Sequence, residues 1–144
     1  MGFDLSGKNP MIHTEEPKNM SDFDARNKWY EDNPGVYFRN NVWWWRPLWG
    51  YVSQVCADIL TDNDLQHGSF NDNHFISKAK CQKISRRLDK LIKDGDVAAY
   101  EKEYEKWRAD KENKDKWSKN YPFSEDNVQR FAVFTKECGG FYIS

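Results

Sequence analysis

Three consecutive tryptophans at positions 43–45 constrain the fold more than any other feature of the sequence. Neighbouring side chains on a helix point about 100° apart, so three adjacent rings cannot all face one core. A helix over 43–60 gathers an apolar arc of Trp45, Leu48, Trp49, Val52, Val55, Cys56, Ile59 and Leu60. Trp43 and Arg46 project away from this arc, and Trp44 lies at its margin. Pro47 has no backbone N–H, so the regular helix is expected to begin between Trp43 and Pro47.

Apolar periodicity predicts further helices over 75–94, 97–117 and 124–138, with Asp96 and Ser124 as N-caps and glycines after two of the ends. A shorter helix is expected over 21–31, capped by Ser21 or Asp22, and a short strand at 36–38. Residues 61–74 are expected to form a polar turn. A strand at 3–5 is expected to pair with one at 141–143. The pattern predicts a mainly α fold with minor β.

This fold is expected to be one compact domain spanning 1–144, with three to four amphipathic helices and a small sheet made from the two termini. Residues 10–33 and 105–120 are expected to be its most irregular parts. Trp107 is expected on the core face of its helix, Trp29 as a looser anchor with Phe23 and Tyr30, and Trp117 in a frayed helix end.

Charge and composition exclude several classes of protein. The 144 residues include 22 basic and 23 acidic side chains, for a net charge of -1, which argues against a protein that coats nucleic acid. No run approaches 18 apolar residues, and the first ten residues do not form a signal peptide, so neither membrane insertion nor secretion is expected. Three widely spaced cysteines indicate reduced thiols and a cytoplasmic protein. The oligomeric state is left open.

The aromatic run and its flanks form the first candidate site. Its residues are Arg39, Asn40, Asn41, Trp43, Trp44 and Arg46. A ring beside a guanidinium suits stacking on a base, while Arg and Asn side chains hydrogen-bond phosphate or base edges. The alternative is an aromatic core over which Arg39 and Arg46 pack by cation–π contact.

A basic face on the helix over 75–94 forms the second candidate site. Seven basic residues and one acidic residue lie between positions 78 and 93, which gives this segment a net charge of +6. Lys83, Arg86, Arg87 and Lys90 are the residues expected to meet a phosphate, an acidic protein or a nucleic-acid backbone. The alternative is a solvated face balanced by nearby acidic residues, namely Asp58, Asp62, Asp64 and Asp72.

Catalytic and metal-binding motifs are weak in this sequence. The order Asp62-x-Asp64-x-Gln66 begins like a calcium loop but lacks its glycine and its final glutamate. No phosphate-binding or nucleophile motif occurs, although a Cys–His pair assembled by folding stays open. No catalytic residue, metal or cofactor is therefore predicted, and an enzyme is the less favoured class.

Four segments carry a family resemblance: GFDLSGKNP, YFRNNVWWWRPLWGYV, GSFNDNHFISK and YPFSEDNVQRFAVFTKECGGF. With them the chain resembles a family of small bacteriophage proteins for which no activity is established. The resemblance implies a phage gene product acting in the cytoplasm of the host bacterium. Some similar proteins carry a Cys-rich, zinc-ribbon-like insertion before YPFS, and this chain lacks those cysteines.

These observations favour two functions. The first is a phage accessory or anti-defence protein that sequesters a small nucleotide-type anionic ligand, such as a host defence signal, through the aromatic-Arg-Asn site. The second is an inhibitor or adaptor that binds a host enzyme, because exposed Trp and Arg dominate many protein interfaces. No motif favours the third class, a small nuclease or hydrolase.

Overall fold

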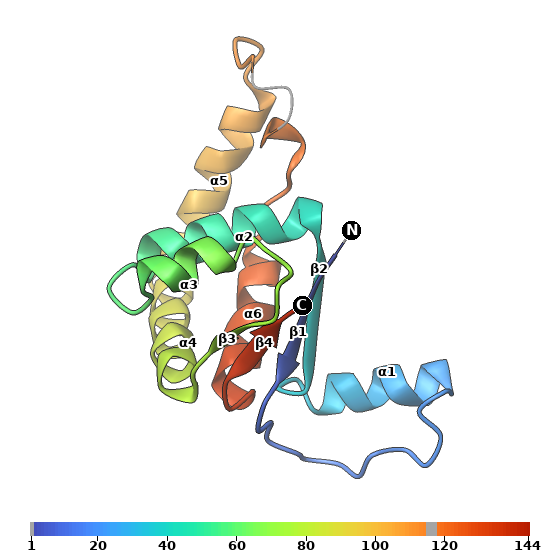
Figure 1. Ribbon diagram of the computed structural model, residues 1–144. Coiled ribbons are helices and arrows are strands. Elements are labelled where there is room, and N and C mark those ends of the chain that lie inside the picture. Colours follow the sequence, from blue (N-terminus) through green and yellow to red (C-terminus); the bar gives the residue numbers. More distant parts are fainter. Residues whose placement is uncertain (1, 115–117) are drawn as a thin grey trace.

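The computed structural model of the protein describes residues 2–114 and 118–144 and is mainly α with minor β, as predicted (Figure 1). The described residues contain more helices than the three to four expected. They are α1 (Phe23–Asp32), α2 (Val42–Val55), α3 (Asp62–His67), α4 (Lys78–Lys93), α5 (Asp96–Ala109), α6 (Glu125–Glu137) and a 3₁₀ turn, η1 (Ser118–Asn120). The strands are β1 (Gly2–Gly7), β2 (Tyr37–Asn41), β3 (His74–Ile76) and β4 (Phe141–Ile143).

The four strands form one antiparallel sheet in the order β2-β1-β4-β3. The predicted pairing of the terminal segments is confirmed, with Leu5 opposite Ile143. The prediction was incomplete because β2 and β3 extend this pair on both sides. β3 was missed because Phe75 and Ile76 also fit the helical period of the segment that follows them.

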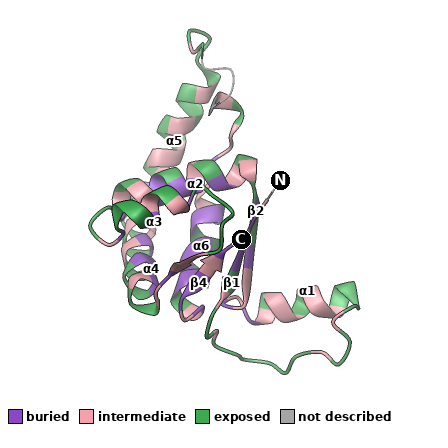
Figure 2. Ribbon diagram, viewed as in Figure 1, coloured by how far each residue is buried: buried purple, intermediate pink, exposed green. Residues whose placement is uncertain are grey.

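Helices α2, α4 and α6 lie on one face of the sheet, whereas α1 and α5 extend away from this body (Figure 1). Alternate strand residues such as Phe3, Leu5 and Phe38 are buried against those helices. Figure 2 shows the burial concentrated in the strands and in the facing sides of the helices. No residue of α1 is buried, and Phe23, expected as an anchor, is 64% exposed.

The Trp45 ring lies at the centre of the core and is fully buried. It stacks on Phe3 of the sheet and on Trp49 one turn along α2, with ring centroids 5.5 and 5.4 Å apart, and meets Phe131 of α6 edge-on. Its indole N–H donates to the Gly68 carbonyl at 2.7 Å. One side chain therefore joins the sheet, two helices and the segment that follows α3.

The helix at the tryptophan run begins one residue earlier than expected and ends earlier. Asn41 caps α2 by accepting a hydrogen bond from the Trp44 N–H at 3.1 Å, which starts the helix at Val42. Pro47 therefore lies inside the helix, where it removes the hydrogen bond that the Trp43 carbonyl would receive. The helix ends at Val55, so the predicted extension to residue 60 is wrong.

The predicted polar turn at 61–74 contains α3 and the start of β3. Thr61 and Asp64 form a reciprocal capping box, in which each side chain accepts from the other's backbone N–H. Such a local motif starts a helix even in a polar segment. The helix predicted from 75 begins at Lys78, capped by Ser77, because the preceding residues belong to β3.

Helix α6 lies close to its predicted position, whereas α5 is shorter than predicted. Asp96 is the first residue of α5 and not its cap, which is Gly95 with a φ of +83°. This helix ends at Ala109, short of the predicted 117, and Trp107 is 38% exposed, so its assignment to a core face was wrong. Trp117 lies outside the described residues. The Ser124 cap of α6 and the Asp22 cap of α1 are confirmed.

We predict that Gly68→Ala destabilises the fold through the Trp49 ring. A Cβ at position 68 would lie 1.9 Å from Trp49 Cε2, so the ring or the backbone must move. Overpacking of this kind costs about 1–3 kcal/mol of unfolding free energy, measurable by chemical denaturation.

Gly50→Ala is the matched control. A Cβ at Gly50 meets nothing within 4 Å, and alanine is favoured over glycine inside a helix by up to about 1 kcal/mol. Equal stability of the two variants would contradict this account of the Gly68–Trp49 contact.

Candidate functional site

The six residues of the predicted aromatic-Arg-Asn site do not line one hollow. Arg39, Asn40, Asn41 and Trp44 border a depression beside β2. Arg46 borders a different depression, which it shares with Trp45, Trp49 and Leu65. Trp43 is 43% exposed and packs on Tyr121, with ring centroids 4.9 Å apart. The six residues of the predicted site therefore lie at three separate places on the protein.

A groove runs along β2, and we call it the β2 groove. Its larger part has a volume of about 750 Å³ and lies between the end of α1, β2 and α6. Its smaller part, of about 460 Å³, continues toward the start of α2. Arg39, Asp126 and Arg130 border both parts. The remaining lining residues are Tyr30, Glu31, Pro34, Tyr37, Phe38, Gln129 and Val133 in the larger part and Asn40, Asn41, Trp44, Ser124 and Asn127 in the smaller part.

Both asparagines of the predicted site are engaged in holding the wall of this groove. Asn40 is buried and exchanges two amide hydrogen bonds with Asn127 of α6, at 3.1 and 2.9 Å. Asn41 caps α2. Because these side chains already have partners inside the protein, they position the groove wall, and the arginines are the groups available to a ligand.

Arg39 is exposed and its Nε donates to Asp4 at 3.1 Å on the neighbouring strand. The Tyr37 hydroxyl donates to the same carboxylate. Burial and this hydrogen bond raise the pKa of Tyr37 to about 12, so the phenol stays protonated and keeps donating at neutral pH. Asp4 therefore orders two side chains on the wall of the β2 groove.

Arg130 is a groove residue that reasoning from the sequence missed. It comes from α6, its guanidinium lies 4.9 Å from the centroid of the Phe38 ring, and it donates to Asn127 at 3.3 Å. The sequence places it about ninety positions from Arg39, and no local pattern joins the two. Only the packing of α6 beside β2 brings both guanidinium groups to one groove.

The four residues of the second candidate site lie together on the surface. Lys83, Arg86, Arg87 and Lys90 border one depression of about 480 Å³, closed on its other side by Asp58 and Ile59. We call it the basic hollow. Of the acidic residues proposed to balance this face, Asp58 pairs with Arg87 and Asp64 with Lys80. Asp72 pairs with a histidine, His67.

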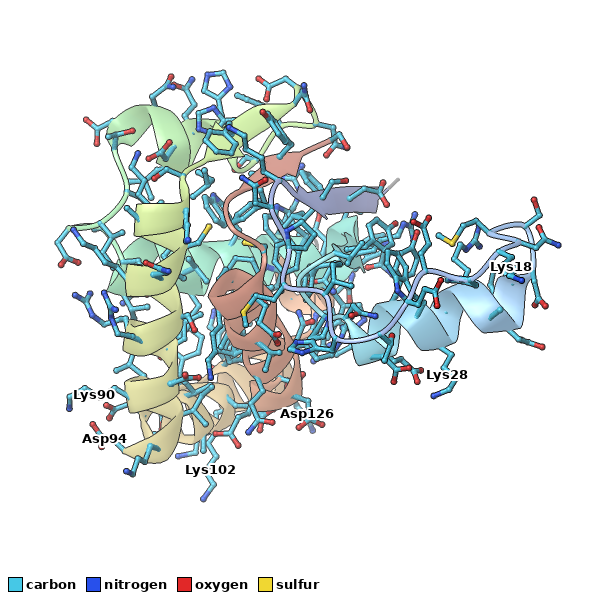
Figure 3. The ribbon with its side chains drawn as sticks, turned by 90° about the horizontal axis from the view of Figure 1, so that it is seen from below. Lys18, Lys28, Lys90, Asp94, Lys102 and Asp126 are labelled. Carbon is cyan, nitrogen blue, oxygen red and sulfur yellow. The ribbon has the colours of Figure 1, made fainter. Side chains whose placement is uncertain are left out.

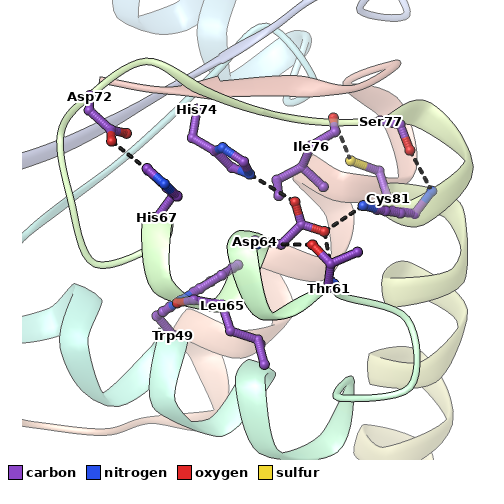
Figure 4. Close-up of polar contacts among 11 residues, drawn as sticks. Trp49, Thr61, Asp64, Leu65, His67, Asp72, His74, Ile76, Ser77 and Cys81 are labelled. Atoms are coloured by element: carbon purple, nitrogen blue, oxygen red, sulfur yellow. Dashed lines mark hydrogen bonds and ion pairs between the residues drawn. The ribbon is translucent and has the colours of Figure 1, made fainter.

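Two histidines stack beside α3, with ring centroids 5.0 Å apart and planes at 16° (Figure 4). His67 contacts Asp72 at 2.5 Å and His74 contacts Asp64 at 2.8 Å. Imidazole lone pairs lie in the ring plane, so nearly parallel stacked rings do not converge on one metal ion. Accordingly, the described residues contain no group of three His, Cys, Asp or Glu side chains placed to hold a metal.

The Cys–His pair that the sequence left open does not form within the described residues. All three cysteines are buried, and each histidine instead contacts a carboxylate, with His13 beside Glu137. Burial raises the pKa of the Cys56 thiol to about 11, which disfavours the thiolate that a nucleophile requires.

No family model, curated protein or solved structure matches the chain. Within the described residues, no helix combines the length and apolar character needed to cross a bilayer. The β2 groove and the basic hollow are therefore the features of the protein that bear on its function.

Asp64 generates a prediction about acid stability. Burial alone would raise its pKa, but hydrogen bonds from Lys80, His74 and the Thr61 N–H outweigh burial and lower the pKa to about 2 (Figure 4). A carboxyl whose pKa is lower in the folded state stabilises the protein above its unfolded pKa, near 4, and loses this contribution as the pH falls to about 2.

We expect Asp64→Asn to lower the free energy of unfolding by about 2 kcal/mol at neutral pH, with the difference vanishing near pH 2. Denaturation curves measured across this range provide the test. Asp62→Asn, in the same turn but exposed, is the control and should cost less than about 1 kcal/mol. A constant difference between Asp64→Asn and the natural protein from pH 7 to pH 2 would refute the prediction.

Proposed function

We propose that the protein binds a small nucleotide-type anionic ligand in the β2 groove. The observation that carries the proposal is the pair of guanidinium groups, Arg39 and Arg130, that border both parts of the groove. Paired guanidinium groups suit phosphate oxygens, because each presents a planar fork of N–H donors. The rings of Tyr30, Tyr37 and Trp44 supply faces on which a base can stack.

The charge of the groove favours a small ligand over a polymer. Arg39 and Arg130 are balanced by Glu31 and Asp126 among the lining residues, so the lining has no net charge. Binding of a nucleic-acid backbone depends on many uncompensated cations. A nucleotide presents a phosphate to the arginines and base N–H donors to the carboxylates, and this combination matches a mixed lining.

The volume of the groove agrees with a ligand of this size. Small-molecule sites usually enclose about 300–1,000 Å³ and combine apolar walls with a few polar groups. The larger part, of about 750 Å³, contains both kinds of lining. The phage resemblance implies that the protein acts in the bacterial cytoplasm. We propose that its cellular role there is to sequester a host signal.

We predict that Arg130→Ala weakens nucleotide binding at least tenfold while leaving the fold intact. Its guanidinium is exposed in the groove, and a hydrogen bond to a charged group contributes about 1.5–3 kcal/mol. Isothermal titration with a panel of cyclic and linear nucleotides first identifies the ligand of the natural protein and then measures the variant against it.

Arg46→Ala is the matched control for this experiment. Arg46 belongs to the site predicted from the sequence, but it borders a separate depression, so its removal should change affinity less than twofold. Loss of binding with Arg46→Ala and not with Arg130→Ala would reject the β2 groove. No binding across the panel at high micromolar concentration would reject the proposed function.

A second function, binding of a partner protein, is favoured by a chain of partly exposed rings. Trp43 packs on Tyr121, whose carbonyl accepts from the Tyr104 hydroxyl, and Tyr104 packs on Trp107 at 5.5 Å. Both tryptophans are more than a third exposed. Exposed tryptophans that are held in place are frequent anchors of protein interfaces.

We predict that Trp43→Ala with Trp107→Ala abolishes capture of a stoichiometric partner from bacterial lysate. Both rings are more than a third exposed, so the free energy of unfolding should fall by less than on truncation of a core tryptophan, which costs about 3–5 kcal/mol. Phe70→Ala, another exposed ring, should retain the partner. If the double variant captured as much of the partner as the natural protein does, this second function would be rejected.

A further inference from the structure

The basic hollow contains an unusual concentration of positive charge for a chain with a net charge of -1. Four basic side chains and one carboxylate border it, so its lining has a net charge of +3. We infer that it is a second binding site, separate from the β2 groove, for a short linear polyphosphate chain. This chain is either free or the tail of a nucleotide.

Ion pairing leaves part of this charge available. Among the seven basic residues of α4, three pair with a carboxylate: Lys80 with Asp64, Arg87 with Asp58 and Lys90 with Asp94. Neither Lys83 nor Arg86 forms an ion pair within the described part of the chain, and both side chains are exposed at the hollow. A polyanion therefore finds two cations that are not held in an ion pair, and the nearby carboxylate, Asp58, is already paired with Arg87.

Arg87 gives the hollow a fixed wall. Its guanidinium donates to both carboxylate oxygens of Asp58, at 2.8 and 2.9 Å, and to the Val55 carbonyl at 2.6 Å. The hydrogen bond from Arg87 lowers the pKa of Asp58 to about 2, so this pair stays ionised at neutral pH. The loop after α2 is thereby fastened to α4, and the hollow exists before a ligand arrives.

The spacing of the cations determines the shape of the ligand. Lys83, Arg86, Arg87 and Lys90 lie at positions i, i+3, i+4 and i+7 of α4, which places them along one stripe. At 1.5 Å per residue this stripe is about 10 Å long. A single phosphate reaches only part of it, whereas two or three linked phosphates can meet several cations at once. We therefore expect affinity to rise with chain length.

Neighbouring carboxylates limit how far an anion can extend. Asp58 closes one wall of the hollow, and Asp94 lies beside Lys90 at the end of α4 (Figure 3). A duplex backbone would carry its phosphates past these carboxylates, while a short chain remains within the stripe. Figure 3 also shows Lys90 well apart from Asp126 of the β2 groove, so the two sites can be tested separately.

The experiment titrates the full chain with phosphate, pyrophosphate and tripolyphosphate at low salt. We expect affinity to increase in that order. Lys83→Ala with Arg86→Ala should weaken tripolyphosphate binding about tenfold or more, which corresponds to the loss of one charged hydrogen bond. Both side chains are exposed, so the melting temperature should stay near that of the natural protein.

Two control variants make the result specific. Lys78→Ala with Lys93→Ala removes the same charge from the same helix without touching the hollow, and should change affinity less than about threefold. Arg39→Ala with Arg130→Ala removes the phosphate-binding groups of the β2 groove, so in this background Lys83→Ala with Arg86→Ala should still weaken tripolyphosphate binding about tenfold or more. The inference is overturned if tripolyphosphate does not bind at millimolar concentration, or if Lys78→Ala with Lys93→Ala weakens binding as much as Lys83→Ala with Arg86→Ala. It is also overturned if Lys83→Ala with Arg86→Ala has no effect in the background of Arg39→Ala with Arg130→Ala.

A last comparison distinguishes the source of the phosphates. With Arg39→Ala and Arg130→Ala present, so that the β2 groove does not contribute, equal affinities for tripolyphosphate and a nucleoside triphosphate would support recognition of the phosphate chain alone. Tighter binding of the nucleoside triphosphate, lost with Lys83→Ala and Arg86→Ala, would support a nucleotide tail. Displacement of tripolyphosphate by a lower concentration of short duplex DNA, counted per phosphate, would overturn the inference in favour of a nucleic-acid surface.

Discussion

The buried Trp45 ring is the contact on which the rest of the structure depends. It stacks on the sheet through Phe3 and meets α6 through Phe131, and its N–H donates to the Gly68 carbonyl. A buried indole must pair its N–H, because a buried polar group without a partner is costly. The Trp49 N–H donates in the same way to the Leu65 carbonyl at 3.1 Å. The polar segment after α2 is thus held against the core by two indole hydrogen bonds.

The sequence predicted most of the helices and strands whose formation depends on neighbouring residues, and missed some that depend on residues far apart in the chain. The apolar period of α2, α4 and α6 can be recognised in a short stretch of sequence. The same holds for the Ser124 cap and for the two glycines with positive φ after α6. Their helices were therefore found, with ends misplaced by a few residues. α3 was missed although Thr61 and Asp64 are local, because the short helix has no apolar period of its own. β3 depends on pairing with β4 at the far end of the chain.

The two candidate sites differ for the same reason. The basic hollow is formed largely by one helix stripe, so spacing alone identified Lys83, Arg86, Arg87 and Lys90. The β2 groove needs α6 beside β2, a contact made by the Asn40–Asn127 amide pair and by Arg130 over Phe38. Reasoning from sequence proximity therefore grouped Arg46 and Trp43 with Arg39, whereas the rotation of α2 turns them to other surfaces.

That rotation also explains how the tryptophan run links the core to the surface. Asn41 is both the last residue of β2 and the N-cap of α2, so no loop separates the strand from the helix. The direction of α2 is consequently fixed by the strand, and the three rings follow at successive angles. Trp45 enters the core, Trp44 turns to the β2 groove and Trp43 turns to Tyr121. Because the ring in the groove and the ring in the core are one residue apart on a rigid backbone, the geometry of the groove is set by the packing of Trp45. A ligand in the groove would therefore bind to a wall that folding has already placed, with little further loss of conformational entropy.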